Sequence, residues 1–196
     1  MSARATRLAK FGVAGLSTEQ RDLYDSILRA RAGGAQAFSL TDEAGGLEGP
    51  FNAMLLCPTL GHALQALGAA VRFGGSLSDR AREIAILTVA GGWDSEFERD
   101  AHEAVGRAVG LSDVEIDAIR DARFETFTDT TERAAAQVAH AMTVDGDLSD
   151  ELFVAASREL GPAVIFEITT LVGYYATLAL QLRVFRVQSG NRLPQP

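Results

Sequence analysis

An all-α fold is predicted by the spacing of apolar residues, by the position of helix-capping residues and by the lack of strand patterns. Apolar side chains recur at three- and four-residue intervals along most of the 196-residue chain, as they do on one face of an α-helix. We find no alternating apolar run and no hairpin turn between apolar runs. The length suits a single core, so we expect a single-domain helical bundle.

The first part of the chain predicts three helical segments. Ser17, with Gln20 three residues later, begins the first one, which carries apolar residues on one face. The glycine-rich stretch 32–50 predicts a loop. A short helical turn is expected over 51–56, and a longer helix runs from Pro58 to the glycines at 74 and 75.

The central part predicts three more helices. Ser78 begins a segment whose core, 81–90, is apolar enough to be fully buried, and Gly91 and Gly92 interrupt it. Ser95 begins the next helix, with Glu98 at the spacing of a capping box, and Ser112 with Glu115 begins another in the same way.

Three helices are expected after residue 129, over 130–144, 149–160 and 162–186. The stretch 162–182 is apolar for most of its length, but it contains Glu167, and a carboxylate is costly inside a membrane. We therefore interpret it as a buried helix and expect no membrane partner. Its carboxylate must find a partner or take up a proton, and we expect an arginine from the region Arg80–Arg82 as the partner.

Composition excludes several classes of function. The net charge of −8 and the pI of about 4.9 argue against nucleic acid and against an anionic membrane surface. Cys57 is the single cysteine, so neither an internal disulfide nor a Cys-x-x-Cys pair can form. No targeting segment is evident, which favours a cytoplasmic protein. We expect an N-terminal extension over 1–16, a helical domain over 17–187 and a loose tail over 188–196.

Two carboxylates and one imidazole are the best candidates for catalysis. His102 follows Glu98 by four residues, so the two side chains share one helix face. Glu83 lies on the preceding helix and approaches His102 if the two helices form a hairpin. Such a trio is suited to general acid–base chemistry. The alternatives are a helix cap at Ser95 and Glu98 and an ordinary solvated Glu–His pair.

The two other histidines and a metal site are weaker candidates for a functional role. His62 and His140 are expected to be structural or surface residues. One histidine with two carboxylates at this spacing is a weak metal signal, so we expect no metal and no cofactor.

The run 77–119, LSDRAREIAILTVAGGWDSEFERDAHEAVGRAVGLSDVEIDAI, resembles the core of the carboxymuconolactone decarboxylase and alkylhydroperoxidase D-like family. The segment GPFNAMLLCP (49–58) resembles the lead-in of its longer members, and FEITTLVGYYATL resembles a later segment. Glu83, Trp93 and His102 keep the family's spacing. The resemblance covers about residues 47–187 and implies the helical bundle of the alkylhydroperoxidase D-like type.

The peroxidase branch of that family uses a Glu, two cysteines separated by two residues, and a His four residues later. Glu83 and His102 match the Glu and the His, but Ser95 and Glu98 stand where the cysteines would be. A serine and a carboxylate cannot cycle through a disulfide. The decarboxylase branch needs no cofactor, and there His102 would donate a proton, Glu83 would orient it, and Glu98 would act as a base or hold a substrate hydroxyl.

The resemblance also implies the substrate contacts and the assembly. We expect five substrate-binding residues, which are Phe51, Asn52, Trp93, Ser95 and Tyr174. Candidate clamps for a substrate carboxylate are Arg80, Arg82 and Arg99, although at least two of them are expected to form surface ion pairs. Family members are usually homo-oligomers, so we expect a dimer, a trimer or a hexamer.

Three functions remain open at this point. The leading one is a cofactor-free enzyme that decarboxylates or isomerises a small oxygenated acid or lactone. The second is a non-catalytic ligand-binding or assembly protein that has lost the redox cysteines. The third is residual peroxidase activity, which would depend on Cys57.

Overall fold

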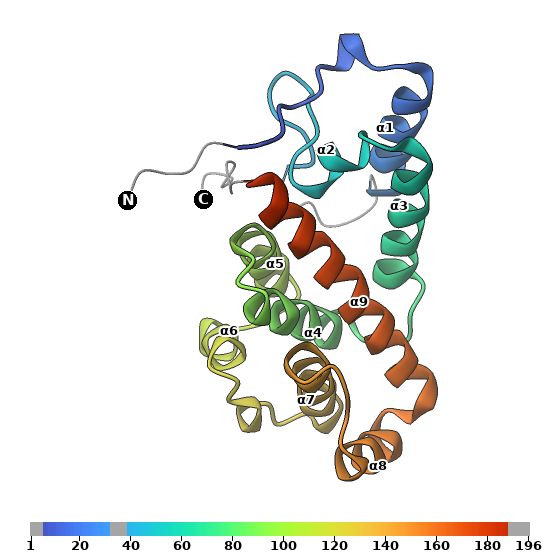
Figure 1. The fold of residues 1–196 in the computed structure, drawn as a ribbon. Helices are drawn as coiled ribbons and strands as arrows, with labels where there is room; N and C mark the ends of the chain where they lie inside the picture. The colour runs from blue at the N-terminus through green and yellow to red at the C-terminus, as the bar shows by residue number, and fades with distance from the viewer. Residues whose placement is uncertain (1–5, 32–38, 188–196) are drawn as a thin grey trace.

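The computed structural model describes residues 6–31 and 39–187, and the fold within them is all-helical, as predicted (Figure 1). The expected tail over 188–196 and parts of the N-terminal extension and of the loop 32–50 lie outside the described residues. The described residues contain no strand, only an isolated bridge between Thr41 and Leu47. The α-helices are α1 (Thr18–Arg31), α2 (Pro50–Met54), α3 (Pro58–Phe73), α4 (Asp79–Gly92), α5 (Glu96–Ala108), α6 (Asp113–Arg120), α7 (Thr130–Val144), α8 (Asp150–Glu159) and α9 (Gly161–Phe185).

Capping residues account for most of the predicted helix boundaries. The Oγ of Ser112 accepts from the backbone N–H of Glu115, whose carboxylate accepts from the N–H of Ser112, which completes a capping box. Ser17 and Gln20 make the same reciprocal pair. Ser95 is the exception, because its hydroxyl caps no backbone N–H. The capping box predicted at Ser95 and Glu98 is therefore wrong.

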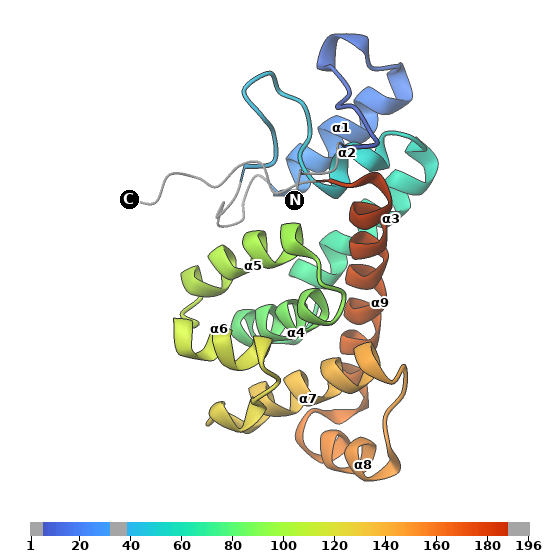
Figure 2. The same ribbon diagram turned by 60° about the vertical axis from the view of Figure 1, so that its left-hand side comes forward.

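Helix α4 is the centre of the bundle. Every residue from Ala81 to Ala90 is buried, and the helix packs against α5, α6, α7 and α9 (Figure 2). A helix that is covered on all sides must be apolar on all sides, which explains its dense run of Ile, Leu, Val and Ala. Because α4 is buried from Ala81 to Ala90, any charged side chain in that stretch needs a partner inside the protein.

Helix α9 crosses the molecule from α8 at one end to α2 at the other (Figure 1). Among the described helices it is the one with the length and apolar composition to span a membrane. Here it packs against α2, α3, α4, α7 and α8, and it buries Ile168, Leu171 and Leu178 in the main core. The expectation of a core helix therefore agrees with its contacts in the structure.

The prediction that an arginine pairs with Glu167 is wrong. Its carboxylate accepts the backbone N–H groups of Ser76 (2.7 Å) and Leu77 (3.3 Å), just before α4. A Cβ on Gly75 would lie 1.9 Å from this carboxylate, so glycine leaves room for the contact. Arg80 instead pairs with Glu115 and Glu132. The carboxylate therefore finds backbone donors, which satisfy its charge without a cation.

Candidate active site

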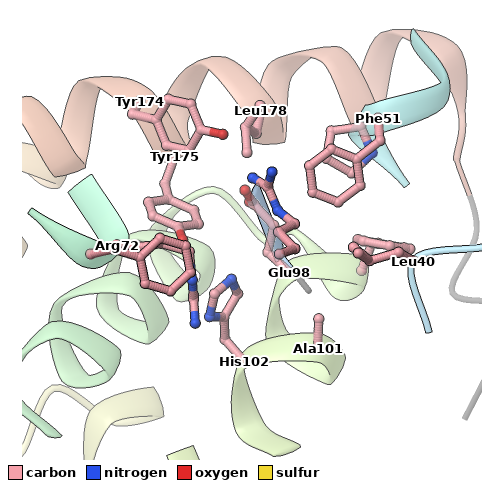
Figure 3. A pocket seen from close by; sticks show the side chains of 13 residues that line it. Leu40, Phe51, Arg72, Glu98, Ala101, His102, Tyr174, Tyr175 and Leu178 are labelled. Carbon is pink, nitrogen blue, oxygen red and sulfur yellow. The ribbon is translucent and has the colours of Figure 1, made fainter. Parts of the chain in front are cut away.

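A pocket lies where the ends of α1 and α3 meet α2, α5 and α9 (Figure 3). Its walls are mainly aromatic and aliphatic, and its polar members are Arg31, Arg72, Glu98, His102 and two tyrosines. A mostly apolar cleft with a few convergent polar groups is the usual form of a small-molecule site.

Glu83 and His102 form a buried pair between α4 and α5. Glu83 Oε2 lies 2.7 Å from His102 Nδ1, and Glu83 Oε1 accepts from Arg72 Nη1 at 3.3 Å. Burial alone would raise the pKa of Glu83, but His102 and Arg72 outweigh it, and the pKa is lowered. Since Nδ1 is held by Glu83, Nε2 is the ring nitrogen left for a ligand.

The turn between α4 and α5 makes this contact possible. Trp93 ends α4, Asp94 takes a left-handed conformation (φ 49°), and the N–H of Ser95 donates to the carbonyl of Ala90 at 2.9 Å. Asp tolerates this conformation better than most residues. The tight reversal makes α4 and α5 antiparallel neighbours, as the glycine break at 91–92 suggested.

Glu98 is a buried carboxyl without a partner. Its side chain lies on the first turn of α5, the residue is 3% exposed, and neither oxygen accepts a hydrogen bond of normal geometry. Burial raises the pKa of Glu98 to about 8, and the nearby hydroxyl of Ser95 opposes this only in part. The carboxyl is therefore mostly protonated at pH 7, one helical turn from His102 in the same pocket.

Two tyrosines of α9 pack beside the imidazole of His102. The ring of Tyr175 meets that of His102 edge-on, with centroids 5.2 Å apart and an interplanar angle of 86°. Tyr174 packs against Tyr175 in the same manner, also at 5.2 Å. Burial raises the pKa of both phenols. Both tyrosines are therefore neutral near pH 7, and they shape the pocket without adding charge.

Arg31 and Arg72, the two arginines that line the pocket, are not among the residues expected from the sequence. They lie in the last turns of α1 and α3, where basic residues are common because they favour the helix dipole. That ordinary explanation gave no reason to single them out. Arg82 pairs with Asp79 and Arg99 with Asp94, and Arg80 pairs away from the pocket as well, so none of the three expected clamps lines it.

The expected substrate contacts divide into two groups. Phe51 and Tyr174 line the pocket, as do Glu98 and His102. Asn52 does not, because its amide accepts from the N–H of Phe11 and donates to the carbonyl of Ala9. Trp93 and Ser95 also lie outside the lining. Trp93 is stacked with Arg183 at 5.8 Å, and Ser95 is buried behind Glu98.

The remaining candidates for redox or metal chemistry lie apart. Cys57 is exposed at the start of α3 and is not among the residues that line the pocket. Within the part of the chain that the structure describes, no three His, Cys, Asp or Glu side chains are grouped in a way that could hold a metal ion.

Residues 58–141 match the model of the carboxymuconolactone decarboxylase family. The chain carries a carboxymuconolactone decarboxylase family domain. This domain holds Glu83, Glu98 and His102, whereas Phe51 and Tyr174 lie before and after it. Since the chain has one cysteine, this domain has no Cys-x-x-Cys pair.

Solved structures of similar fold match most of the chain. An AhpD-core, peroxidase-related protein from Ralstonia eutropha JMP134 has a TM-score of 0.75 at 15% identity, over 96% of this chain and 94% of that one. A variant of the debrominase Bmp8, in complex with 2,3,4-tribromopyrrole, has a TM-score of 0.73 at 13% identity over the same shares of the two chains. The carboxymuconolactone decarboxylase family domain therefore has the fold of the AhpD core.

A third solved structure has a higher sequence identity to this chain than the two above. ATU0492 from Agrobacterium tumefaciens, a protein of unknown function named for the antioxidant defence protein AhpD, is 25% identical, with a TM-score of 0.64 over 72% of this chain and 97% of that one. No curated protein matches the chain. The carboxymuconolactone decarboxylase family contains enzymes, and the neighbours include a debrominase and AhpD-like proteins.

Proposed function

We propose that this protein is a cofactor-free acid–base enzyme that decarboxylates or isomerises a small oxygenated acid or lactone. The observation that carries the proposal is the unpartnered, protonated carboxyl of Glu98 beside His102 in an aromatic pocket. A buried acid without a hydrogen-bond partner destabilises a protein. Such a group is characteristic of sites that transfer protons.

The geometry suits each residue to one role. Glu98 donates a proton, because its carboxyl is mostly protonated at pH 7. His102 Nε2 accepts or returns a proton, and Glu83 is a positioning residue that holds the ring through Nδ1. From sequence, Glu98 was expected to be a base or to hold a hydroxyl, whereas its raised pKa supports the acid role that we propose here.

Two reactions use these roles with balanced atoms. In an isomerisation, His102 removes a proton next to a conjugated carbonyl, the electron pair moves into the dienolate, and Glu98 protonates a different carbon. In a decarboxylation, the bond between the substrate carbon and its carboxylate breaks and carbon dioxide leaves. The electron pair of that bond moves into the conjugated carbonyl. A proton from Glu98 or His102 is then added to a carbon of the resulting dienolate. The substrate is the electron sink in both reactions.

The residues do not support disulfide cycling. Ser95 and Glu98 provide no thiol, and Cys57 is exposed outside the pocket lining. A peroxidase that reduces peroxide through a disulfide needs two thiols within reach. We therefore do not transfer that activity from the AhpD-like neighbours to this chain.

The test is turnover of a panel of unsaturated lactone acids and β-keto acids. Carbon dioxide release and ultraviolet absorbance report decarboxylation and isomerisation, respectively. We expect activity to fall at least 100-fold in both Glu98→Gln and His102→Ala. The matched control is Glu96→Gln, an exposed glutamate in the same turn of α5, and it should keep native activity.

Full turnover in His102→Ala would refute the proposal. No turnover of any acid by the folded protein would also count against it and would favour a ligand-binding protein. Peroxide consumption that is lost in Cys57→Ser would instead favour residual peroxidase activity.

A further inference from the structure

Arg31 carries a positive charge that no carboxylate of the described chain neutralises. Arg72, the other arginine of the pocket, pairs with Glu83. The Arg31 guanidinium donates through Nη1 to the neutral amide oxygen of Gln65, at 3.2 Å, and it also interacts with the neutral phenol of Tyr174. A guanidinium has five N–H donors, so most of its capacity to bind an anion remains unused.

The guanidinium is held in position before any ligand binds. Its carbon lies 4.4 Å from the centre of the Phe51 ring, and Gln65, which is 5% exposed, also donates to the carbonyl of Ser26 at 3.4 Å. Cation–π stacking and a buried amide fix the plane of the fork. A preorganised fork loses little entropy when it binds a carboxylate.

The other charges of the pocket do not compensate Arg31. Glu83 is committed to His102 and Arg72. Glu98 is mostly protonated at pH 7, so it adds little negative charge. An aromatic pocket with one uncompensated cation favours an anionic ligand that has a flat apolar body.

We propose that Arg31 binds the carboxylate of a planar, conjugated acid and directs its unsaturated body toward Glu98 and His102, which line the same pocket. This inference rests on the proposed function, because that function makes the unsaturated body the part of the substrate that reacts. The carboxylate bound by Arg31 does not react. It narrows the substrate class to conjugated acids that keep one carboxylate throughout the reaction.

The first experiment measures binding by calorimetry, with benzoate and its neutral isostere benzamide as probes. The native protein should bind benzoate more tightly than benzamide. Arg31→Met should lose at least tenfold in benzoate affinity and change less than twofold for benzamide. Arg31→Lys keeps the charge and should lose less than Arg31→Met. Arg99→Met removes an arginine that pairs with Asp94 away from the pocket, and it should bind both probes as the native protein does.

The second experiment uses pH. Native affinity for benzoate should fall as pH rises through about 8, because Glu98 becomes an anion. The affinity of Glu98→Gln for benzoate should lack this fall between pH 7 and pH 9, whatever its value at pH 7. The titratable and charged groups that line the pocket around Glu98 come from α1, α3, α5 and α9, and they are Arg31, Arg72, His102, Tyr174 and Tyr175. All of them remain in the Glu98→Gln variant, so the difference between the two profiles reports Glu98.

The outcomes separate this inference from the proposed function. An equal loss of benzoate and benzamide in Arg31→Met would overturn the inference, because it would reflect a damaged pocket. Arg31-dependent benzoate binding without turnover of any acid would leave the inference intact and refute only the enzyme. Turnover with an unchanged KM in Arg31→Met would overturn the inference and leave the proposed function intact.

Discussion

The hydroxyl of Tyr174 occupies the space that a side chain on Gly68 would need. A Cβ built on Gly68 would lie 2.2 Å from that oxygen, far inside van der Waals contact. The contact joins α3 to α9 and sets the ring that forms one wall of the pocket. The absence of a side chain at position 68 is therefore a condition for the shape of the site.

Gly68→Ala should destabilise the protein and disturb the pocket. Alanine favours a helix over glycine by up to about 1 kcal/mol, but displacing Tyr174 should cost about 1–3 kcal/mol. Thermal unfolding and benzoate titration measure the two effects. Gly173→Ala is the control, because a Cβ there meets nothing within 4 Å, and it should be neutral or stabilising. Equal stability of the two variants would contradict the packing described for Tyr174.

Glu98→Gln should stabilise the protein in a pH-dependent manner. An unfolded Glu titrates near 4.5, and the folded carboxyl titrates at about 8. Between these values the folded state keeps a proton that the unfolded state loses, so stability falls as pH rises. The gain from Glu98→Gln should thus be larger at pH 7 than at pH 4, by on the order of 3 kcal/mol.

Denaturant titrations of the native protein and of Glu98→Gln at the two pH values measure this difference. The exposed Glu96→Gln variant is the reference for a glutamate outside the core. A gain that does not depend on pH would show that Glu98 is ionised in the folded protein.

Two serines at helix starts should respond differently to alanine. Ser112 completes a capping box, so Ser112→Ala should cost about 1 kcal/mol. Ser95 caps nothing, and its buried hydroxyl has no hydrogen-bond partner of normal geometry. Ser95→Ala should therefore be close to neutral. Urea unfolding of both variants compares them directly, and a larger loss for Ser95→Ala would contradict the contacts described here.

We also expect the protein to form a homo-oligomer in solution. Leu60 is 69% exposed on α3 and Phe166 is 74% exposed on α9, and exposed apolar side chains of this size favour burial between subunits. Light scattering should detect a species larger than 20.8 kDa. Leu60→Asp and Phe166→Asp should reduce its size. A monomer at all concentrations would rule out the assembly.

Local sequence rules predicted the helices, because these depend on short-range patterns. Helical spacing places Glu98 and His102 on one helix face, but the approach of Glu83 depended on a hairpin between α4 and α5, and only the structure shows that hairpin. Arg31 could not be found in this way, since it reaches the pocket only through the packing of α1 on α2 and α3. The same reason explains the error at Glu167, because a sequence pattern does not show which backbone N–H groups a carboxylate will meet.

The pocket is assembled from separate stretches of the chain. Arg31 and Phe51 precede the family domain at 58–141, whereas Glu98 and His102, the residues proposed to transfer protons, lie inside it. The residues proposed to hold a substrate can therefore be changed independently of the residues proposed to react with it. For protein engineering, substitutions at Arg31 and Phe51 are a route to new ligands that leaves Glu98 and His102 unchanged.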